Sequence, residues 1–290
     1  MPAPTVWTIR GRDLSLARPV VMGIVNVTPD SFSDGGRFLS PGAALAHAAK
    51  LVAEGADILD VGGESTRPQG ARPVSTDEEL RRVLPIIRTL AAERPDVLIS
   101  VDTVKAAVAE AAIAAGARIV NDVSGFRLDA EMAPLCAAAG VGVVVMHSRG
   151  SVSDMATFAH AEYGPSFLDE MLDELASRVR AVERAGVRPG AIAVDPGIGF
   201  SKRAEHSLRA LACLDRLAAW GFPVVVGPSR KRFIGEIVGE ANPLRRVFGS
   251  VGAAVAAYDR GAHVLRVHDV AATRHALDVV AAIRDAGDER

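Results

Sequence analysis

The sequence predicts a single-domain alpha/beta protein with a (β/α)8 TIM barrel, and an open doubly wound sheet is the alternative. Eight short apolar runs rich in Val and Ile recur along the 290 residues. Longer segments rich in Ala and Leu, with helical spacing, follow many of them. Because the runs lack polar alternation, they suit parallel strands that are covered on both faces.

The first half of the chain contains four of these units. Strands are expected at 19–25, 56–62, 97–102 and 117–122, and helical spacing is clearest at 43–56, 76–93 and 105–117. Ser75 and Glu78 form a candidate capping box before the second of these helices. Several helical segments end at Gly, as helix C-termini commonly do.

The second half contains the other four units. Strands are expected at 140–147, 191–196, 223–228 and 262–268, with helices at 167–186 and 249–262. The segment Ser148 to Gly164 is the longest stretch without clear periodicity. It follows a strand end, which is where barrels carry their functional loops.

Composition supports one domain, with residues 1–18 as a lead-in that closes the barrel bottom and 19–290 as the catalytic barrel. The net charge of −2 provides no long-range attraction for nucleic acid or acidic lipid. No signal-length segment or apolar run of the ~20 residues needed to cross a bilayer is present. Cys136 and Cys213 suit small buried hydrophobes better than a disulfide or metal site. We therefore expect a soluble, cytoplasmic protein.

Nearly every expected strand ends in polar side chains, and in a barrel these ends converge on one mouth, where active sites lie. A single buried Asp or Asn often only caps a helix, but the whole set predicts a site. The residues are Asn26, Asp60, Glu64, Asp102, Asn121, Asp122, His147, Asp195, Ser229, Lys231, Arg266 and His268.

The acidic part of this set calls for a ligand rich in hydrogen-bond donors. Asp102, Asn121 and Asp195 supply mainly acceptors, and neighbouring carboxylates satisfy each other poorly. The amino-pyrimidinone edge of a pterin or guanine presents adjacent N–H donors, which pair bidentately with a carboxylate. Metal binding by the same carboxylates is the rival interpretation.

The basic part of the set indicates an anion. In GPSRKRFIG, cations stand at the expected start of a helix, where they oppose the helix dipole. Ser229 is expected to cap this helix, while Lys231 and Arg232 hold carboxylate or phosphate oxygens. A solvated basic turn is the alternative. Arg266 and His268, together with Asn26, form a second candidate oxyanion site.

Eight motifs, one per strand, resemble those of the dihydropteroate synthase family. They cover residues from about 20 to 270 in order and read VMGIVNVTPDSFSDGG, GADILDVGGESTRP, ISVDT, IVNDVSG, VVMH, VDPGIGFSK, GPSRKRFIG and LRVHDV. This chain departs from the family pattern at HSRGSV, where Gln and Pro are common, and at GFSKRAEH, where GFGKTxxH is common. Neither departure removes a residue assigned to chemistry.

The resemblance implies a reaction between 7,8-dihydropterin-6-ylmethyl pyrophosphate and para-aminobenzoate that yields dihydropteroate and pyrophosphate. It implies residue roles, with departure of pyrophosphate running ahead of attack. Pterin contacts are Asp102, Asn121, Met146, Asp195 and Lys231. Pyrophosphate contacts are Asn26, Thr66, Arg67, Arg266 and His268, with Mg2+ held at Asn26, near Asp34. Para-aminobenzoate contacts are Phe32, Pro68, Phe200, Lys231 and Arg232. Catalytic residues are Asp34, Arg67 and Lys231.

The resemblance also implies that the loops carrying Phe32 and Pro68 close over the mouth, with Asp34 paired to Arg67, so that water is excluded. It further implies sulfonamide inhibition and a homodimer formed through the late helices. A pterin-binding methyltransferase module and a pterin-binding paralogue without catalysis are competing interpretations. Both have little use for the two loops and the Arg266–His268 pair.

Overall fold

The computed structural model describes residues 4–28, 41–64 and 74–288, and eight parallel strands form its barrel wall. The strands are β3 (Val20–Asn26), β4 (Ile58–Gly62), β5 (Leu98–Asp102), β6 (Ile119–Asp122), β7 (Gly142–Met146), β8 (Ile192–Asp195), β9 (Val225–Val226) and β10 (Val264–Val267). Their order is β8-β7-β6-β5-β4-β3-β10-β9. The two end strands meet where Val194 bridges Val224 and its backbone N–H donates to the Pro223 carbonyl at 2.9 Å. The predicted barrel is confirmed, and the open doubly wound sheet is wrong.

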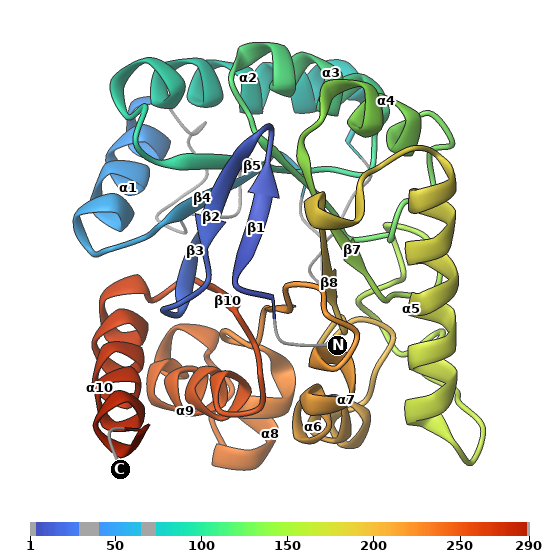
Figure 1. The fold of residues 1–290 in the computed structure, drawn as a ribbon, viewed down its shortest axis with the longest axis vertical. Helices are drawn as coiled ribbons and strands as arrows, with labels where there is room; N and C mark the ends of the chain where they lie inside the picture. Colours follow the sequence, from blue (N-terminus) through green and yellow to red (C-terminus); the bar gives the residue numbers. More distant parts are fainter. Residues whose placement is uncertain (1–3, 29–40, 65–73, 289–290) are drawn as a thin grey trace.

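Helices surround the strands as an outer layer (Figure 1). They are α1 (Pro41–Ala53), α2 (Thr76–Glu93), α3 (Ala106–Ala115), α4 (Met132–Ala139), α5 (Phe167–Arg184), α6 (Ala204–Ala212), α7 (Leu214–Ala218), α8 (Arg232–Val238), α9 (Val247–Tyr258) and α10 (Val270–Asp288). Short 3-10 turns at η1 (Pro189–Ala191) and η2 (Pro243–Arg245) precede β8 and α9. Only one of the two hydrogen bonds of the predicted capping box forms. Ser75 accepts from the Glu78 amide at 3.3 Å, but the Glu78 carboxylate pairs with Arg82 instead of returning to the cap.

Side chains along each strand alternate between two clusters, because successive residues of a strand point to opposite faces. One set, including Val61, Val101 and Val145, packs beneath the helices. The other set fills the barrel interior near the strand starts: Val20, Met22, Ile58, Ile119, Val144, Ala193, Val225 and Val264. Further along the strands, the inward positions become polar. The barrel is therefore apolar at its base and polar toward its mouth.

An antiparallel hairpin of β1 (Val6–Ile9) and β2 (Arg12–Ser15) covers the base of the barrel, in front of the strands in Figure 1. Trp7 and Ile9 are fully buried in the interior cluster, and the Trp7 indole N–H donates to the Ala191 carbonyl at 2.9 Å. A Cβ at Gly142 would lie 3.0 Å from Ile9, so glycine leaves room for the hairpin. The lead-in thus shares the barrel core.

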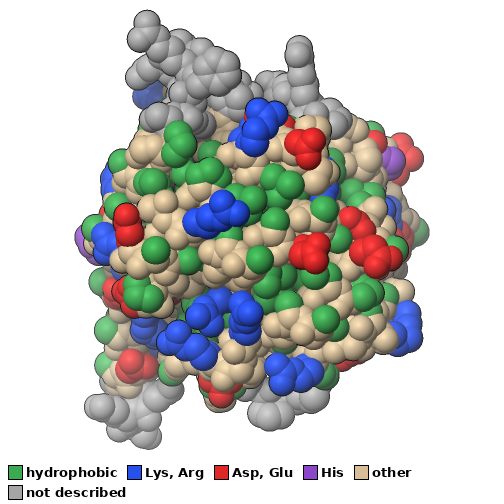
Figure 2. All heavy atoms as spheres, turned by 90° about the horizontal axis from the view of Figure 1, so that it is seen from above, with side chains coloured by type: hydrophobic (Ala, Val, Ile, Leu, Met, Phe, Trp, Pro, Cys, Tyr) green, Lys and Arg blue, Asp and Glu red, His purple; other side chains and the backbone are tan. Residues whose placement is uncertain are grey.

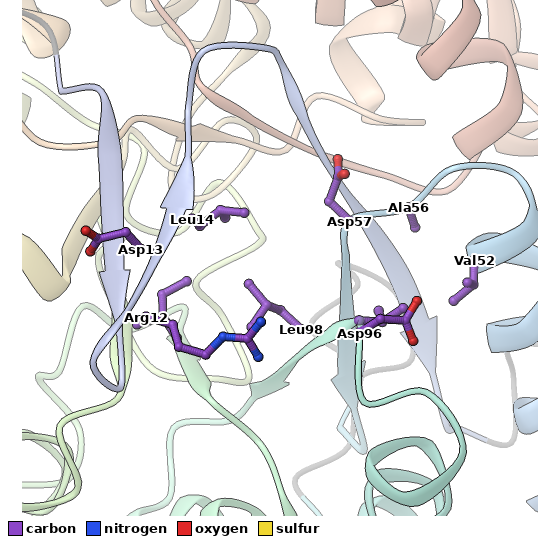
Figure 3. Close-up of a pocket in the computed structure, with 10 residues that line it drawn as sticks. Arg12, Asp13, Leu14, Val52, Ala56, Asp57, Asp96 and Leu98 are labelled. Atoms are coloured by element: carbon purple, nitrogen blue, oxygen red, sulfur yellow. The ribbon is translucent and has the colours of Figure 1, made fainter.

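A cavity of about 340 Å3 lies beside this hairpin, where Figure 3 shows Arg12 extending from β2 toward Leu98. Asp57, which also lines it, accepts from the Val21 amide at 2.8 Å and pairs with Arg18 and Arg274. These interactions tie β3 and α10 to the barrel base. We assign this cavity to closure of the barrel bottom.

The outer surface over α2 to α4 carries acidic and basic side chains among apolar ones, with a group of Lys and Arg on the hairpin side (Figure 2). Within the described residues, every helix is too short or too polar to cross a bilayer.

Cys136 is buried in the core and Cys213 is half-buried, and both are free thiols. Burial raises the pKa of Cys136 to about 12, so it packs as a small apolar side chain.

Candidate active site

The polar side chains at the strand ends meet at the mouth of the barrel, away from the hairpin. Asp102 ends β5 and pairs in register with Asn121 of β6, while Met146 of β7 pairs with Asp195 of β8. Arg266 reaches the same interior from β10. The parallel strands therefore bring acceptors from β5, β6 and β8, a cation from β10 and the Met146 side chain of β7 to one end of the barrel.

Arg266 joins three strands across the barrel. Its Nε donates to Oδ2 of Asp60 at 2.6 Å, and its Nη2 donates to Oδ2 of Asp102 at 2.6 Å. The Asn121 amide donates to the same Asp60 oxygen at 3.1 Å. The other Asp60 oxygen is buried and lacks a hydrogen-bond partner among the described residues. Two carboxylates thus share one guanidinium, which leaves the cluster with unused acceptors.

The pKa values of the acidic groups reflect this shortage of donors. Burial raises the pKa of Asp102 to about 7; Arg266 lowers it, but Asp60 raises it again. Burial raises the pKa of Asp195 to about 6, although the Gly197 amide and Lys231 oppose the shift. Each carboxylate is harder to ionise than in water, so a ligand that supplies N–H donors would stabilise the ionised forms.

Lys231 follows β9 and interacts electrostatically with both Asp195 and Asp102. Its Nζ is 4.0 Å from the centre of the Phe200 ring, and its pKa is lowered to about 8 by burial and by Arg266. A Cβ at Gly199 would approach the Lys231 stem to 3.0 Å, so glycine permits this placement. Asp195 accepts from the Gly197 amide at 2.7 Å. The segment 197–200 thus orients an acid, a ring and a cation together.

The basic turn differs from the sequence expectation in two respects. Ser229 does not cap α8; its hydroxyl meets His268 Nδ1 at 3.1 Å and accepts from the His268 amide at 3.2 Å. The N-cap of α8 is Lys231, without a side-chain cap hydrogen bond. Arg230, at φ 59°, turns its guanidinium to the Asp269 carboxylate. Ser229 was assigned wrongly because a residue 39 positions away competes for its hydroxyl.

Three further predicted contacts lie at the ends of β3, β7 and β10. Met146 is buried against Phe200, Val104 and Val123, and Asn26 is half-buried at the end of β3. His268 follows β10, next to the serine described above. Five predicted site residues lie outside the described residues: Phe32, Asp34, Thr66, Arg67 and Pro68.

The segment 148–164 has a defined structure although its sequence lacks periodicity. Arg149 donates to Glu174 of α5 at 3.0 Å and to the Glu162 carbonyl at 2.6 Å. The Ser201 hydroxyl donates to the Arg149 carbonyl at 2.8 Å, and the Tyr163 hydroxyl donates to the Ser201 carbonyl at 2.8 Å. The segment is therefore fastened to the loop that carries Phe200.

The sequence analysis did not predict a series of hydrogen-bonded polar side chains that lies beneath this loop. Lys202 is only 2% exposed and meets His147 Nδ1 at 2.7 Å and the Phe200 carbonyl at 3.2 Å. The other ring nitrogen of His147 meets Glu174 at 3.2 Å. Burial lowers the pKa of His147 to about 3, so the ring is neutral. Asp60 was in the predicted polar set but received no role in binding or chemistry, and the structure places it against Arg266 and Asn121.

Comparison with known proteins gives a family match. The family described as pterin binding enzyme matches residues 22–268. Dihydropteroate synthase from Mycobacterium leprae is 44% identical over 95% of this chain and 97% of its own length. Dihydropteroate synthase from Synechocystis is also 44% identical, over 92% of this chain and 90% of its own length.

Solved structures resemble this one throughout. Xanthomonas albilineans dihydropteroate synthase with 4-aminobenzoic acid has a TM-score of 0.89 and 46% identity, covering 97% of this chain and 98% of the other. The same protein in complex with 7,8-dihydropteroate has a TM-score of 0.86 and 44% identity, covering 96% and 98%. The Yersinia pestis enzyme with a sulfonamide drug complex has a TM-score of 0.89 and 40% identity, covering 97% and 99%.

Proposed function

We propose that this chain condenses 7,8-dihydropterin-6-ylmethyl pyrophosphate with para-aminobenzoate. The premise is that the chain belongs to the dihydropteroate synthase family. The products are 7,8-dihydropteroate and pyrophosphate. The observation that carries the proposal is the wall of buried carboxylates beside Lys231 and Arg266, in which one Asp60 oxygen lacks a partner among the described residues. That wall suits a fused ring with N–H donors on one side and an anion on the other.

The pterin lies against the acidic wall in this proposal. Asp195 and Asp102 accept from its ring N–H groups, Asn121 completes the edge, and Met146 packs against the ring face. Lys231 lies between Asp195 and the Phe200 ring and donates to the pterin. Because the carboxylates are partly desolvated before the ligand arrives, each hydrogen bond they accept forms with little competing water.

Bond cleavage needs charge dispersal more than a nucleophile. The bond between the pterin methylene and the pyrophosphate oxygen breaks, its electron pair stays with pyrophosphate, and the methylene cation spreads into the pterin. Arg266, His268 and Asn26 hold the departing anion. The aryl amine, which is neutral near pH 7, then attacks the methylene, and the resulting ammonium loses its proton to solvent when the site reopens. The ionised wall favours the cation that forms.

The two loops outside the described residues complete the site in this proposal. Asp34 pairs with Arg67, Phe32 and Pro68 pack on the arylamine ring, and Thr66 contacts pyrophosphate. Closing the loops would exclude water, which would otherwise capture the cation. Asp34, Arg67 and Lys231 are therefore the residues to which we assign catalytic roles.

Magnesium fits this site only as a companion of pyrophosphate. The described residues contain no group of three or more His, Cys, Asp or Glu side chains that could hold a metal ion. Asn26 offers one amide oxygen at the mouth, and Mg2+ commonly takes few protein ligands while it keeps waters and binds phosphate. When bound, the ion would offset the charge of the leaving group.

The arylamine pocket lies on the other side of Lys231. Phe200 forms its floor, and Lys231 and Arg232 are the cations that face the para-aminobenzoate carboxylate. A sulfonamide of similar shape is expected to compete for this pocket. The free thiols of Cys136 and Cys213 fit a reducing compartment, so we also place the protein in the cytoplasm.

The direct test mixes purified protein with the pterin pyrophosphate, para-aminobenzoate and Mg2+. We expect equal rates of pyrophosphate release and dihydropteroate formation, inhibition by a sulfonamide, and loss of rate on chelation of Mg2+. Pterin binding without turnover would support the inert paralogue instead. Turnover of a methyl donor would support the methyltransferase module.

We also propose a homodimer formed through α6, α8 and α9, which lie together in Figure 1. An apolar groove of about 310 Å3 runs between them, and Phe248 beside it is 90% exposed. Ile237 and Val238 are exposed on α8, and Leu244 is exposed on η2, between α8 and α9. Large contiguous apolar surfaces of this kind mark interfaces, and a second copy covers them symmetrically. Gly249 of α9 serves packing within the chain, since a Cβ there would meet Ile234 at 2.4 Å, whereas a Cβ at Gly252 would meet no atom within 4 Å.

Phe248→Asp tests this interface. We expect the variant to sediment as a monomer at concentrations where the parent is a dimer, because a carboxylate would be buried without a partner. Val6→Asp, at an exposed apolar position on the hairpin, is the matched control and should keep the parent's mass. A dimeric Phe248→Asp variant would place the interface elsewhere.

A further inference from the structure

Two consecutive cations at the arylamine pocket each lie over an aromatic ring. Lys231 Nζ is 4.0 Å from the Phe200 ring centre, and Arg232 Cζ is 3.7 Å from the Phe158 ring centre. Arg203 Cζ lies 5.0 Å from the same Phe158 centre. Phe158 belongs to the 148–164 segment, to which the proposed reaction assigns no role.

We propose that Phe158 is a positioning residue for the arylamine: its ring holds the Arg232 guanidinium, with Arg203 as a second cation, where the substrate carboxylate binds. The inference deepens the proposed function and rests on it, because Arg232 is assigned to that carboxylate. It adds a residue that touches the cations and not the reacting atoms. Its consequence is selectivity for anionic arylamines over neutral ones.

A ring holds a cation without neutralising it. A guanidinium stacked over a phenyl ring keeps its charge and leaves its edge N–H groups available for a bidentate carboxylate. The acid nearest Arg232 is Glu236, at 3.7 Å, and these two side chains are 41% and 49% exposed, so their pairing is weak. Within the described residues no carboxylate forms an ion pair with Arg203. Positive charge therefore remains at this edge of the pocket.

The Phe158 ring is held in place by the segment around it. Met155 and Ala156, just before it in the chain, are buried in the cluster that contains Phe200. The Met155 carbonyl accepts from the Ser201 amide at 2.6 Å, and the Ser201 hydroxyl oxygen lies 3.1 Å from it. The position of Phe158 thus depends on the same loop that places Phe200. The rings beneath Lys231 and Arg232 are therefore positioned by the same pair of hydrogen-bonded loops.

Phe158→Leu tests the proposal by steady-state kinetics. Losing the cation–π contact should raise the KM for para-aminobenzoate by about three- to tenfold. The kcat and the KM for the pterin pyrophosphate should stay at the parent's values. With 4-aminobenzamide, which lacks the negative charge, parent and variant should have equal KM values. Phe158→Tyr keeps the ring and should restore the parent's KM for para-aminobenzoate.

The outcomes separate this inference from the proposed function. An active parent with an unchanged KM for para-aminobenzoate in Phe158→Leu overturns the inference alone. An equal rise in KM for the acid and for the neutral amide also overturns it, because the ring would then act only in packing. A folded parent that forms no dihydropteroate defeats the proposed function. Arg203→Ala should raise the KM for the acid in the same direction, again without effect on the neutral amide.

Discussion

We expect Arg266→Met to lower the free energy of unfolding by about 3–5 kcal/mol near pH 8, because it leaves buried carboxylates without their counter-charge. Arg266 donates to both Asp60 and Asp102, and its own side chain is 18% exposed. Urea denaturation of parent and variant measures the difference. Part of the loss is relieved by protonation, since the Asp102 pKa rises further when the guanidinium is removed.

The pH dependence of this loss provides its internal control. The folded-state pKa of Asp102 is already raised to about 7, above the value of about 3.9 for an unfolded Asp. Ionising a carboxyl group whose pKa is raised in the folded state lowers the free energy of unfolding as pH rises. The difference in free energy of unfolding between parent and Arg266→Met should therefore be largest at high pH and become small toward about pH 5. Arg266→Lys keeps one charge but cannot bridge both acids, and should fall between parent and Met. A loss independent of pH would contradict the shared-guanidinium arrangement.

Asp195→Asn is expected to weaken binding of a pterin lacking the pyrophosphate by about 10- to 100-fold near pH 8, since a hydrogen bond to a charged acceptor contributes about 1.5–3 kcal/mol. Asn keeps the shape and an acceptor for the Gly197 amide but loses the charge. Isothermal titration calorimetry gives the affinity. Because the Asp195 pKa is raised to about 6, the parent's affinity should fall as pH falls through that value.

The variant lacks that titration, so the two affinities should converge toward about pH 5. Asp122→Asn is the matched control. Burial raises the Asp122 pKa to about 6 as well. This carboxylate accepts hydrogen bonds from the Ser124 and Phe126 amides and so stabilises the turn that follows β6. Its replacement should change unfolding and leave the pterin affinity close to that of the parent. Equal loss of affinity in both variants would remove Asp195 from the pterin pocket.

Most of the fold follows from local pattern. The runs at 56–62 and 97–102 lack polar alternation because both strand faces are covered, and that property is visible in the letters alone. The same runs show where a strand stops, and parallel strands have their ends on one side. The predicted gathering of Asp102, Asn121 and Asp195 on one end of the barrel needed no further information.

Partners across the barrel could not be read in this way. Arg266 donates to Asp60 and Asp102, which are 206 and 164 positions away. The sequence alone did not indicate which basic side chain each acid would pair with. Ser229 had the residue type and place of a helix cap, yet His268 takes its hydroxyl. Lys202 is a surface residue by composition, and its burial against His147 arises only when two loops meet.

The sequence by itself determined the level at which polar side chains lie along the barrel, because these residues end apolar runs that form parallel strands. Only the tertiary structure decided which acid shares which cation and which ring lies beneath Lys231 and Arg232. Those choices depend on distances of a few ångströms between segments far apart in the chain. Charge, hydrogen-bond geometry and burial act over that range, whereas local propensity does not.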